Sequence, residues 1–177
     1  MGTLKPFRIG FLWLLFAIPA LAGQTADPCT LPPDLRMELA THYPSAAVVT
    51  LSDLGNDDRS LFLKEHPNAC PGLAAVDFYG DGKPTLALAL LVRRGSVENA
   101  DLLVAHQTAE GWKLKLLDAA KSSVPVVWSQ PGGRYNDVYR NKTLHATRPV
   151  IVFCGYYSWA IVYSWTGTRI DKVWIMD

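Results

Sequence analysis

The feature that most constrains the fold of this chain is an alternation of large and small side chains over residues 157–165. The large side chains stand at the odd positions, which are Tyr157, Trp159, Ile161, Tyr163 and Trp165. The even positions between them hold only Ser, Ala and Val. Because successive side chains of a strand point to opposite faces, the segment predicts a β-strand with one bulky and one small face.

Two interpretations of the bulky face follow. We favour a face that belongs to the core, because aromatic side chains dominate core packing. In the alternative, part of the face is open and stacks against a glycan chain or a partner protein, since an exposed aromatic patch needs an explanation. The binding residues predicted under this alternative are Trp128, Arg134, Tyr135, Tyr157 and Trp159.

Strand patterns also dominate the rest of the chain after residue 72. They cover residues 73–78, 84–92, 102–106, 112–116, 150–154 and 170–176, whereas residues 122–139 are irregular and contain a Pro-Gly-Gly turn or mobile loop. Before them, helix signals span residues 32–43 and 56–66, with a short strand at 46–51 between. Two short N-terminal helices followed by a mainly antiparallel sheet predict an α+β fold, and residues 23–177 have the length of one domain.

The first 22 residues have the pattern of a cleaved secretory signal peptide. Lys5 and Arg8 precede an apolar run over residues 9–18, and Ala20-Leu21-Ala22 supplies small residues for cleavage. The run is about half the length that a membrane-spanning helix needs. We therefore expect an exported protein, periplasmic or secreted, with no membrane span after cleavage.

Three cysteines lie beyond this leader. An exported protein meets an oxidising environment, so one disulfide is expected and one thiol remains. Cys29 and Cys70 stand beside prolines in turn-like contexts, whereas Cys154 ends an apolar run and suits a buried free thiol. We favour the pairing Cys29–Cys70, with Cys70–Cys154 as the alternative.

Residues 77–85, with the sequence DFYGDGKPT, form the most distinctive local motif. The segment resembles the calcium-type loop of FG-GAP and VCBS repeats, in which spaced Asp and Asn residues direct oxygens at one point and a glycine permits the bend. The resemblance implies Asp77 and Asp81 as metal-binding candidates. Tyr79 and Thr85 stand where that pattern has oxygen ligands, so we favour a hairpin turn that keeps the glycines without a metal, and no cofactor.

More broadly, the chain is similar to a group of small bacterial exported proteins. The similarity rests on residues 69–83 (ACPGLAAVDFYGDGK) and on two segments near the C-terminus, VIVFCGY at 150–156 and YSWTG at 163–167. It implies export and a shared fold, and it transfers no catalytic residue.

Motifs of the common enzyme classes are absent from the sequence. No histidine pair has the spacing of a helical zinc site, and neither a Cys-x-x-Cys nor a Gly-x-Ser-x-Gly motif occurs. Loss of Lys5 and Arg8 with the leader turns the formal charge from +1 to −1, unlike a nucleic-acid-binding protein. The sequence does not decide whether the protein is an enzyme, but we favour an exported non-catalytic domain that binds a protein or cell-envelope component.

Two alternatives remain open. The first is a small envelope hydrolase whose site would be formed by His106, His145 and the turn that carries Asp77 and Asp81. The second is a calcium-stabilised structural module built on the same turn.

Overall fold

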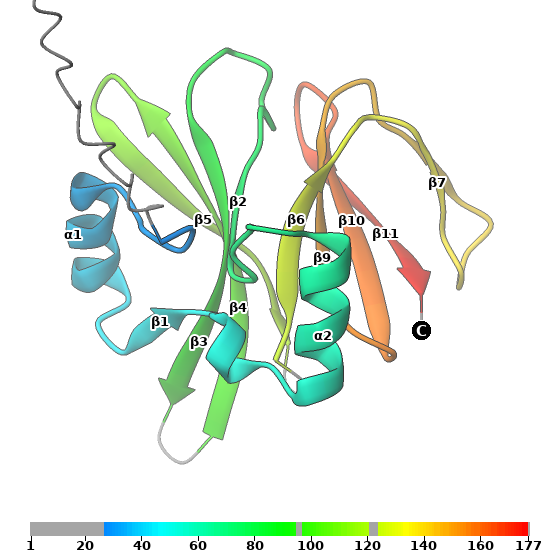
Figure 1. Ribbon diagram of the computed structural model, residues 1–177. Coiled ribbons are helices and arrows are strands. Elements are labelled where there is room, and N and C mark those ends of the chain that lie inside the picture. Colours follow the sequence, from blue (N-terminus) through cyan, green and yellow to red (C-terminus); the bar gives the residue numbers. More distant parts are fainter. Residues whose placement is uncertain (1–26, 95–96, 121–123, 177) are drawn as a thin grey trace, which may run out of the picture.

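The computed structural model describes residues 27–94, 97–120 and 124–176. The predicted signal peptide, residues 1–22, lies outside the described residues. Within them the chain is mainly antiparallel β-structure with two short α-helices, α1 (Pro33–His42) and α2 (Asn56–Glu65) (Figure 1). No helix in these ranges is long and apolar enough to cross a membrane.

The first sheet follows the first helix in the chain. It contains β1 (Ala46–Val48), β2 (Leu73–Ala75), β3 (Thr85–Arg94), β4 (Val97–Thr108) and β5 (Gly111–Ala120). The strands β1 and β2 lie end to end along one edge of β3. At their junction Ala89 of β3 accepts a hydrogen bond from the Val49 N–H and donates one to the Gly72 carbonyl, each 3.0 Å long.

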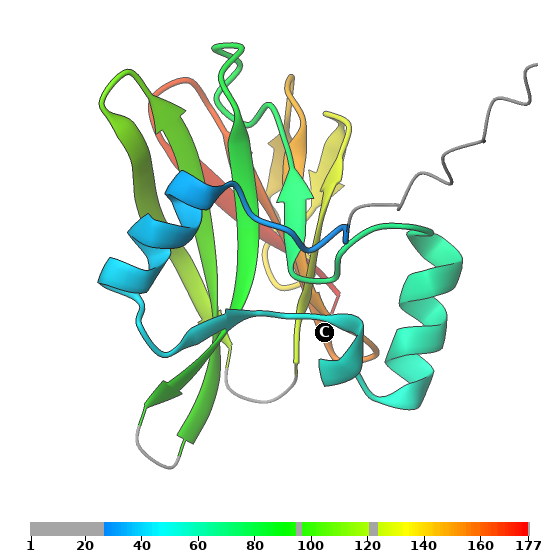
Figure 2. The ribbon, with the colours of Figure 1, turned by 60° about the vertical axis from the view of Figure 1, so that its left-hand side comes forward.

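The central strand β3 is apolar on both faces, which explains its almost unbroken apolar sequence. Leu88 and Leu90 pack against Leu35 and Leu39 of α1, which crosses the outer face of the sheet (Figure 2). The alternate residues, such as Ala89, face the second sheet. Side chains on the two faces thus alternate along the strand, as they do in any β-strand.

The second sheet has the order β11-β10-β9-β6. Its strands are β6 (Val126–Gln130), β9 (Val150–Gly155), β10 (Trp159–Trp165) and β11 (Ile170–Met176). A hairpin of β7 (Arg134–Asn136) and β8 (Thr143–His145) covers its outer face, where Leu144 packs against Val152 and Val162. Every side chain of β9 is therefore buried.

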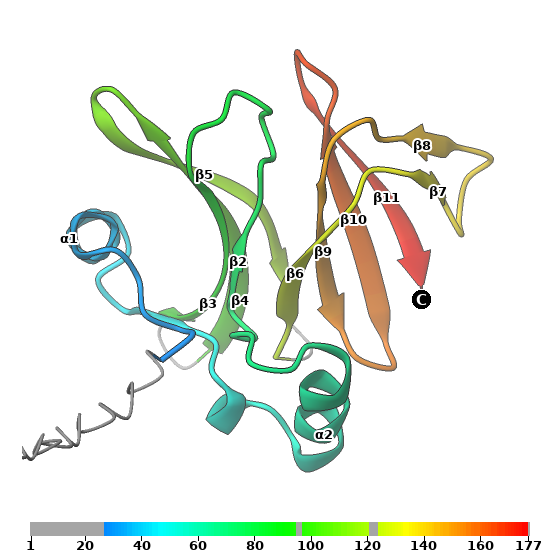
Figure 3. The same ribbon diagram turned by 45° about the horizontal axis from the view of Figure 1, so that its top comes forward.

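The largest core lies between the two sheets (Figure 3). Ile161 and Tyr163 of β10 are buried in it, and Phe62 of α2 fills one end. The favoured interpretation of the large-small alternation is thus correct for these positions. Tyr157 precedes the strand and is exposed, which the sequence pattern did not distinguish.

The two sheets approach each other at both sides. On one side the Val127 N–H donates to the Pro71 carbonyl at 2.8 Å, joining β6 to the segment before β2. On the other side Asp118 of β5 accepts hydrogen bonds from Lys172 of β11, at 2.6 Å, and from the Tyr163 hydroxyl. We call this second side the seam.

A disulfide joins Cys29 to Cys70, the pairing favoured from the sequence. It ties the segment before α1 to the residue next to Pro71, where the sheets join. Cys154 is free and buried.

Several parts of the chain differ from the sequence prediction, among them residues 46–51 and 122–139. The strand expected at 46–51 ends at Val48, and the single 3₁₀ turn η1 (Leu51–Asp53) follows, closed by a capping box between Thr50 and Asp53. The region 122–139, expected to be irregular, contains β6 and β7. Both strands are too short for a period to be recognised.

Candidate functional site

Three exposed side chains and two partly buried tryptophan rings lie at or beside one end of β10 and β11. We define the aromatic surface as Tyr139, Tyr157, Trp159, Trp174 and Met176. The ring of Trp174 lies 5.8 Å from Tyr139 and 6.4 Å from Trp159, measured between centroids. Trp159 contacts Phe153 of the main core at 5.0 Å, so the surface is continuous with the hydrophobic interior.

The segment that carries Tyr139 is fixed to the edge of β11. One carboxylate oxygen of Asp137 accepts hydrogen bonds from the backbone N–H groups of Tyr139 and Arg140, both at 2.9 Å, and the other accepts from Trp174 at 3.3 Å. The Val138 N–H donates to the Trp174 carbonyl. Burial opposes ionisation, but these hydrogen bonds outweigh it and hold the pKa of Asp137 below its ordinary value. The backbone of Tyr139 is therefore fixed, and the residue is 56% exposed.

Tyr157 is the most exposed large hydrophobic residue of the described chain, at 74%. It lies in the tight turn between β9 and β10 with φ +58°, a conformation that side chains with a Cβ disfavour. Glycine would satisfy this turn without strain. The position therefore combines two costs, backbone strain and exposure of an aromatic ring.

The five binding residues predicted from the sequence fall into separate groups. Tyr157 and Trp159 belong to the aromatic surface. Trp128 lies on β6, at the opposite edge of the second sheet, with its ring 4.9 Å from that of His66. Tyr135 and Arg134 lie on β7, and the Tyr135 hydroxyl donates to the Pro131 carbonyl at 2.8 Å.

The loop between β2 and β3 places Asp81 beside His106. Asp81 Oδ2 lies 3.2 Å from His106 Nε2, and His106 Nδ1 lies 2.8 Å from the Thr85 hydroxyl. Burial by itself raises the pKa of Asp81. The hydrogen bond from the Lys83 N–H and the charge of His106 outweigh burial, so this pKa lies below its ordinary value. A hydroxyl, an imidazole and a carboxylate are thus connected in series.

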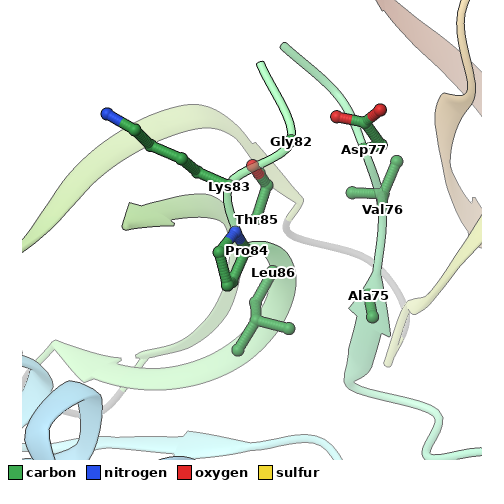
Figure 4. Close-up of a pocket in the computed structure, with 8 residues that line it drawn as sticks. All are labelled: Ala75, Val76, Asp77, Gly82, Lys83, Pro84, Thr85 and Leu86. Carbon is green, nitrogen blue, oxygen red and sulfur yellow. The ribbon is translucent and has the colours of Figure 1, made fainter. Parts of the chain in front are cut away.

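This series does not reproduce the predicted hydrolase site. Thr85 is only 2% exposed, so its hydroxyl is poorly accessible as a nucleophile. His145 lies on β8 over the outer face of the second sheet, whereas His106 belongs to the first sheet. An open depression of about 530 Å³ adjoins the loop, with Asp77 on one arm and Lys83 and Thr85 on the other (Figure 4).

Of the two predicted metal residues, Asp81 contacts His106 and the Lys83 N–H, whereas Asp77 is exposed. Among the described residues, no group of three or more His, Cys, Asp or Glu side chains could hold a metal ion. The Tyr79 carbonyl, at the third position of the motif, accepts a hydrogen bond from Arg148. The Tyr79 carbonyl and the Asp81 carboxylate thus already have protein partners, whereas a calcium ion takes six to eight oxygens.

The remaining nucleophile candidate of the described chain is Cys154. Burial raises the pKa of its thiol to about 12, and the carboxylates of Glu65 and Asp58 act in the same direction. The thiol stays protonated at neutral pH, so it does not act as a nucleophile.

Comparison with family models, curated proteins and solved structures finds no match to this chain. The function is therefore inferred from the geometry. Trp159 and Trp174 of the aromatic surface pack against the main core, whereas Tyr139, Tyr157 and Met176 are exposed, so core packing explains only part of this surface.

Proposed function

We propose that this chain is an exported, non-catalytic α+β domain that binds a partner protein through the aromatic surface. The observation that carries the proposal is Tyr157. A strained backbone residue persists where the surrounding structure holds it, and such residues gather at functional sites. A bulky aromatic residue at a position that suits glycine is best explained by a contact it makes outside the chain.

The composition of the surface favours a protein as the partner. Tyr, Trp, Met and Arg are enriched at the centres of protein interfaces. Tyr139 contacts Trp174, Met176 is exposed two residues further along β11, and Arg140 follows Tyr139 on the segment that Asp137 holds. Partly buried rings that are already fixed lose little conformational freedom on binding, which strengthens association.

Export is supported by two features. The N-terminal 22 residues have the order of a signal peptide. The Cys29–Cys70 disulfide is typical of proteins that fold outside the reducing cytosol. The periplasm or the extracellular space is the compartment we propose.

The proposal is tested by site-specific photo-crosslinking in the native envelope. A photoreactive amino acid at position 157 or 139 should capture one and the same protein. Position 37 is the control, because Met37 is 68% exposed on α1, on the other face of the first sheet. Equal capture of that protein from position 37, or none from 157 and 139, would show that the aromatic surface does not bind it.

A further inference from the structure

Arg148 enters the loop between β2 and β3 from the other sheet. It lies in the connection between β8 and β9, and its guanidinium group donates to the Tyr79 carbonyl. The same group lies directly over Gly80, where an added Cβ would be 2.6 Å from Nε and 2.7 Å from Cζ. Only a glycine with its positive φ of 66° allows this approach.

The backbone of Arg148 also packs closely against a glycine. A Cβ at Gly132 would lie 2.8 Å from the Arg148 carbonyl oxygen and 3.0 Å from its nitrogen. The Ala146 N–H donates to the Gly133 carbonyl at 2.8 Å, which fixes the adjoining segment. Glycines from two separate loops thus enclose this one arginine.

Two other oxygen-bearing side chains of the motif, those of Asp81 and Thr85, already face protein groups, whereas Asp77 is exposed. The Asp81 carboxylate contacts His106 and the Lys83 N–H, and the Thr85 hydroxyl contacts the second nitrogen of His106. The Tyr79 carbonyl accepts a hydrogen bond from Arg148, so oxygens at three positions of the loop have protein partners.

We propose that Arg148 is the resident cation of residues 77–85 and takes the role that calcium has in the loops this segment resembles. The guanidinium group fixes the loop to the second sheet. It thereby holds the Tyr79 ring against Trp165 of β10, at 5.1 Å, and against His106, at 4.6 Å. Arg148, and not a bound metal, then determines the order of the loop.

Hydrogen exchange measured by mass spectrometry tests this directly. Peptides covering 77–85 are compared in the wild type and Arg148→Met, each in millimolar calcium and in EDTA. Wild-type exchange should be the same in both buffers. Loss of a charged hydrogen bond should speed exchange of the loop in Arg148→Met by about tenfold or more. Arg169→Met, at an arginine whose side chain is 75% exposed, should leave the loop unchanged.

A second variant covers the case in which Arg148→Met fails to fold. Gly80→Ala keeps the positive charge but places a methyl group where the guanidinium lies, so it should speed exchange of the loop more than Gly82→Ala, which also substitutes a glycine of positive φ but meets nothing within 4 Å. Calcium-dependent protection of residues 77–85 in the wild type overturns the proposal. Wild-type exchange rates in the loop of whichever variant folds overturn it equally.

Discussion

Lys172 Nζ lies 2.6 Å from Asp118 Oδ2 and joins β11 to β5 across the seam. In the described chain these two edge strands have no ladder between them, so side chains alone close this side of the core. Asp118 also accepts a hydrogen bond from the hydroxyl group of Tyr163, and the ring of this tyrosine is buried between the sheets. One carboxylate therefore links the two sheets on this side of the core.

We expect Asp118→Asn to lower the free energy of unfolding at pH 7 by about 1–2 kcal/mol, because a partly buried charged hydrogen-bond acceptor is lost. Burial works against ionisation, but the bonds from Lys172 and Tyr163 depress the pKa of Asp118. The contribution of the Asp118 carboxylate to stability is therefore fully present above its pKa in the unfolded chain, about 3.9. It is lost as the pH falls through the lower pKa of the folded protein. Urea unfolding at pH 7 and pH 3 should show the two proteins converging in acid.

The control for that measurement is Glu110→Gln. Glu110 and Lys113 form an ion pair whose side chains are 80% and 64% exposed. Exposed pairs contribute little, so this variant should differ from the wild type by under about 0.5 kcal/mol at pH 7. Equal losses in both variants would contradict the role given to Asp118.

Tyr157→Gly should stabilise the isolated domain by about 1 kcal/mol, because glycine relieves the strain of a positive φ. It should also abolish crosslinking from position 139 to the proposed partner. The matched control is Asn68→Gly at φ +63°, where asparagine already tolerates the conformation and little change is expected. Thermal unfolding of both variants measures the difference, and a less stable Tyr157→Gly protein would mean that the side chain serves the fold.

Removing the disulfide in Cys29→Ser/Cys70→Ser should cost about 2–5 kcal/mol, since the bridge restrains two positions 41 residues apart. The same loss should follow from adding a reductant to the wild type. Denaturant unfolding with and without reductant makes the comparison. A reductant effect that persists in the double variant would show that the loss arises elsewhere.

The Cys154 thiol should be unreactive in the native protein. Its pKa of about 12 and its burial leave almost no accessible thiolate at neutral pH. Labelling with a thiol reagent should therefore proceed at the rate of unfolding and accelerate in urea. Rapid stoichiometric labelling without denaturant would contradict this.

Gly72→Ala should destabilise the fold by about 3 kcal/mol or more, because the new Cβ would lie 2.5 Å from the backbone nitrogen and oxygen of Val49. Those atoms cannot move without breaking the junction of β1 and β2 on β3. Gly133→Ala is the control, since its Cβ would meet only ordinary contacts with Tyr135. Thermal unfolding of the two variants should separate them clearly.

Periodic segments of this fold could be predicted from the sequence because their neighbours impose the pattern. The alternation in β3 follows from α1 on one side and the second sheet on the other. The helices α1 and α2 begin and end within a residue or two of their predicted bounds, where proline and histidine-proline signals stand. Local chemistry determines these features.

The candidate site depended on contacts that no local pattern encodes. Tyr139 belongs to the aromatic surface because Asp137 binds the backbone of β11, more than 30 residues later in the chain. The strand β6 is only five residues long, and its place is fixed by Pro71 and β9. Residues 77–85 resemble a calcium-type loop, and a metal-free hairpin turn was the favoured interpretation; that Gly80 lies beneath an arginine from a distant segment is a contact that no local pattern encodes.

Because the main core lies between two sheets that are made one after the other, the fold also has a consequence for synthesis of the polypeptide. During synthesis the strands up to residue 120 can pair, but the apolar inner face of that sheet waits for residues 150–176 to arrive. Until then, the nascent chain exposes apolar surface that favours aggregation. Truncated variants that end before β9 should therefore aggregate and be found in the insoluble fraction. Export of the unfolded chain would delay folding, and with it the risk of aggregation, until the complete sequence is present.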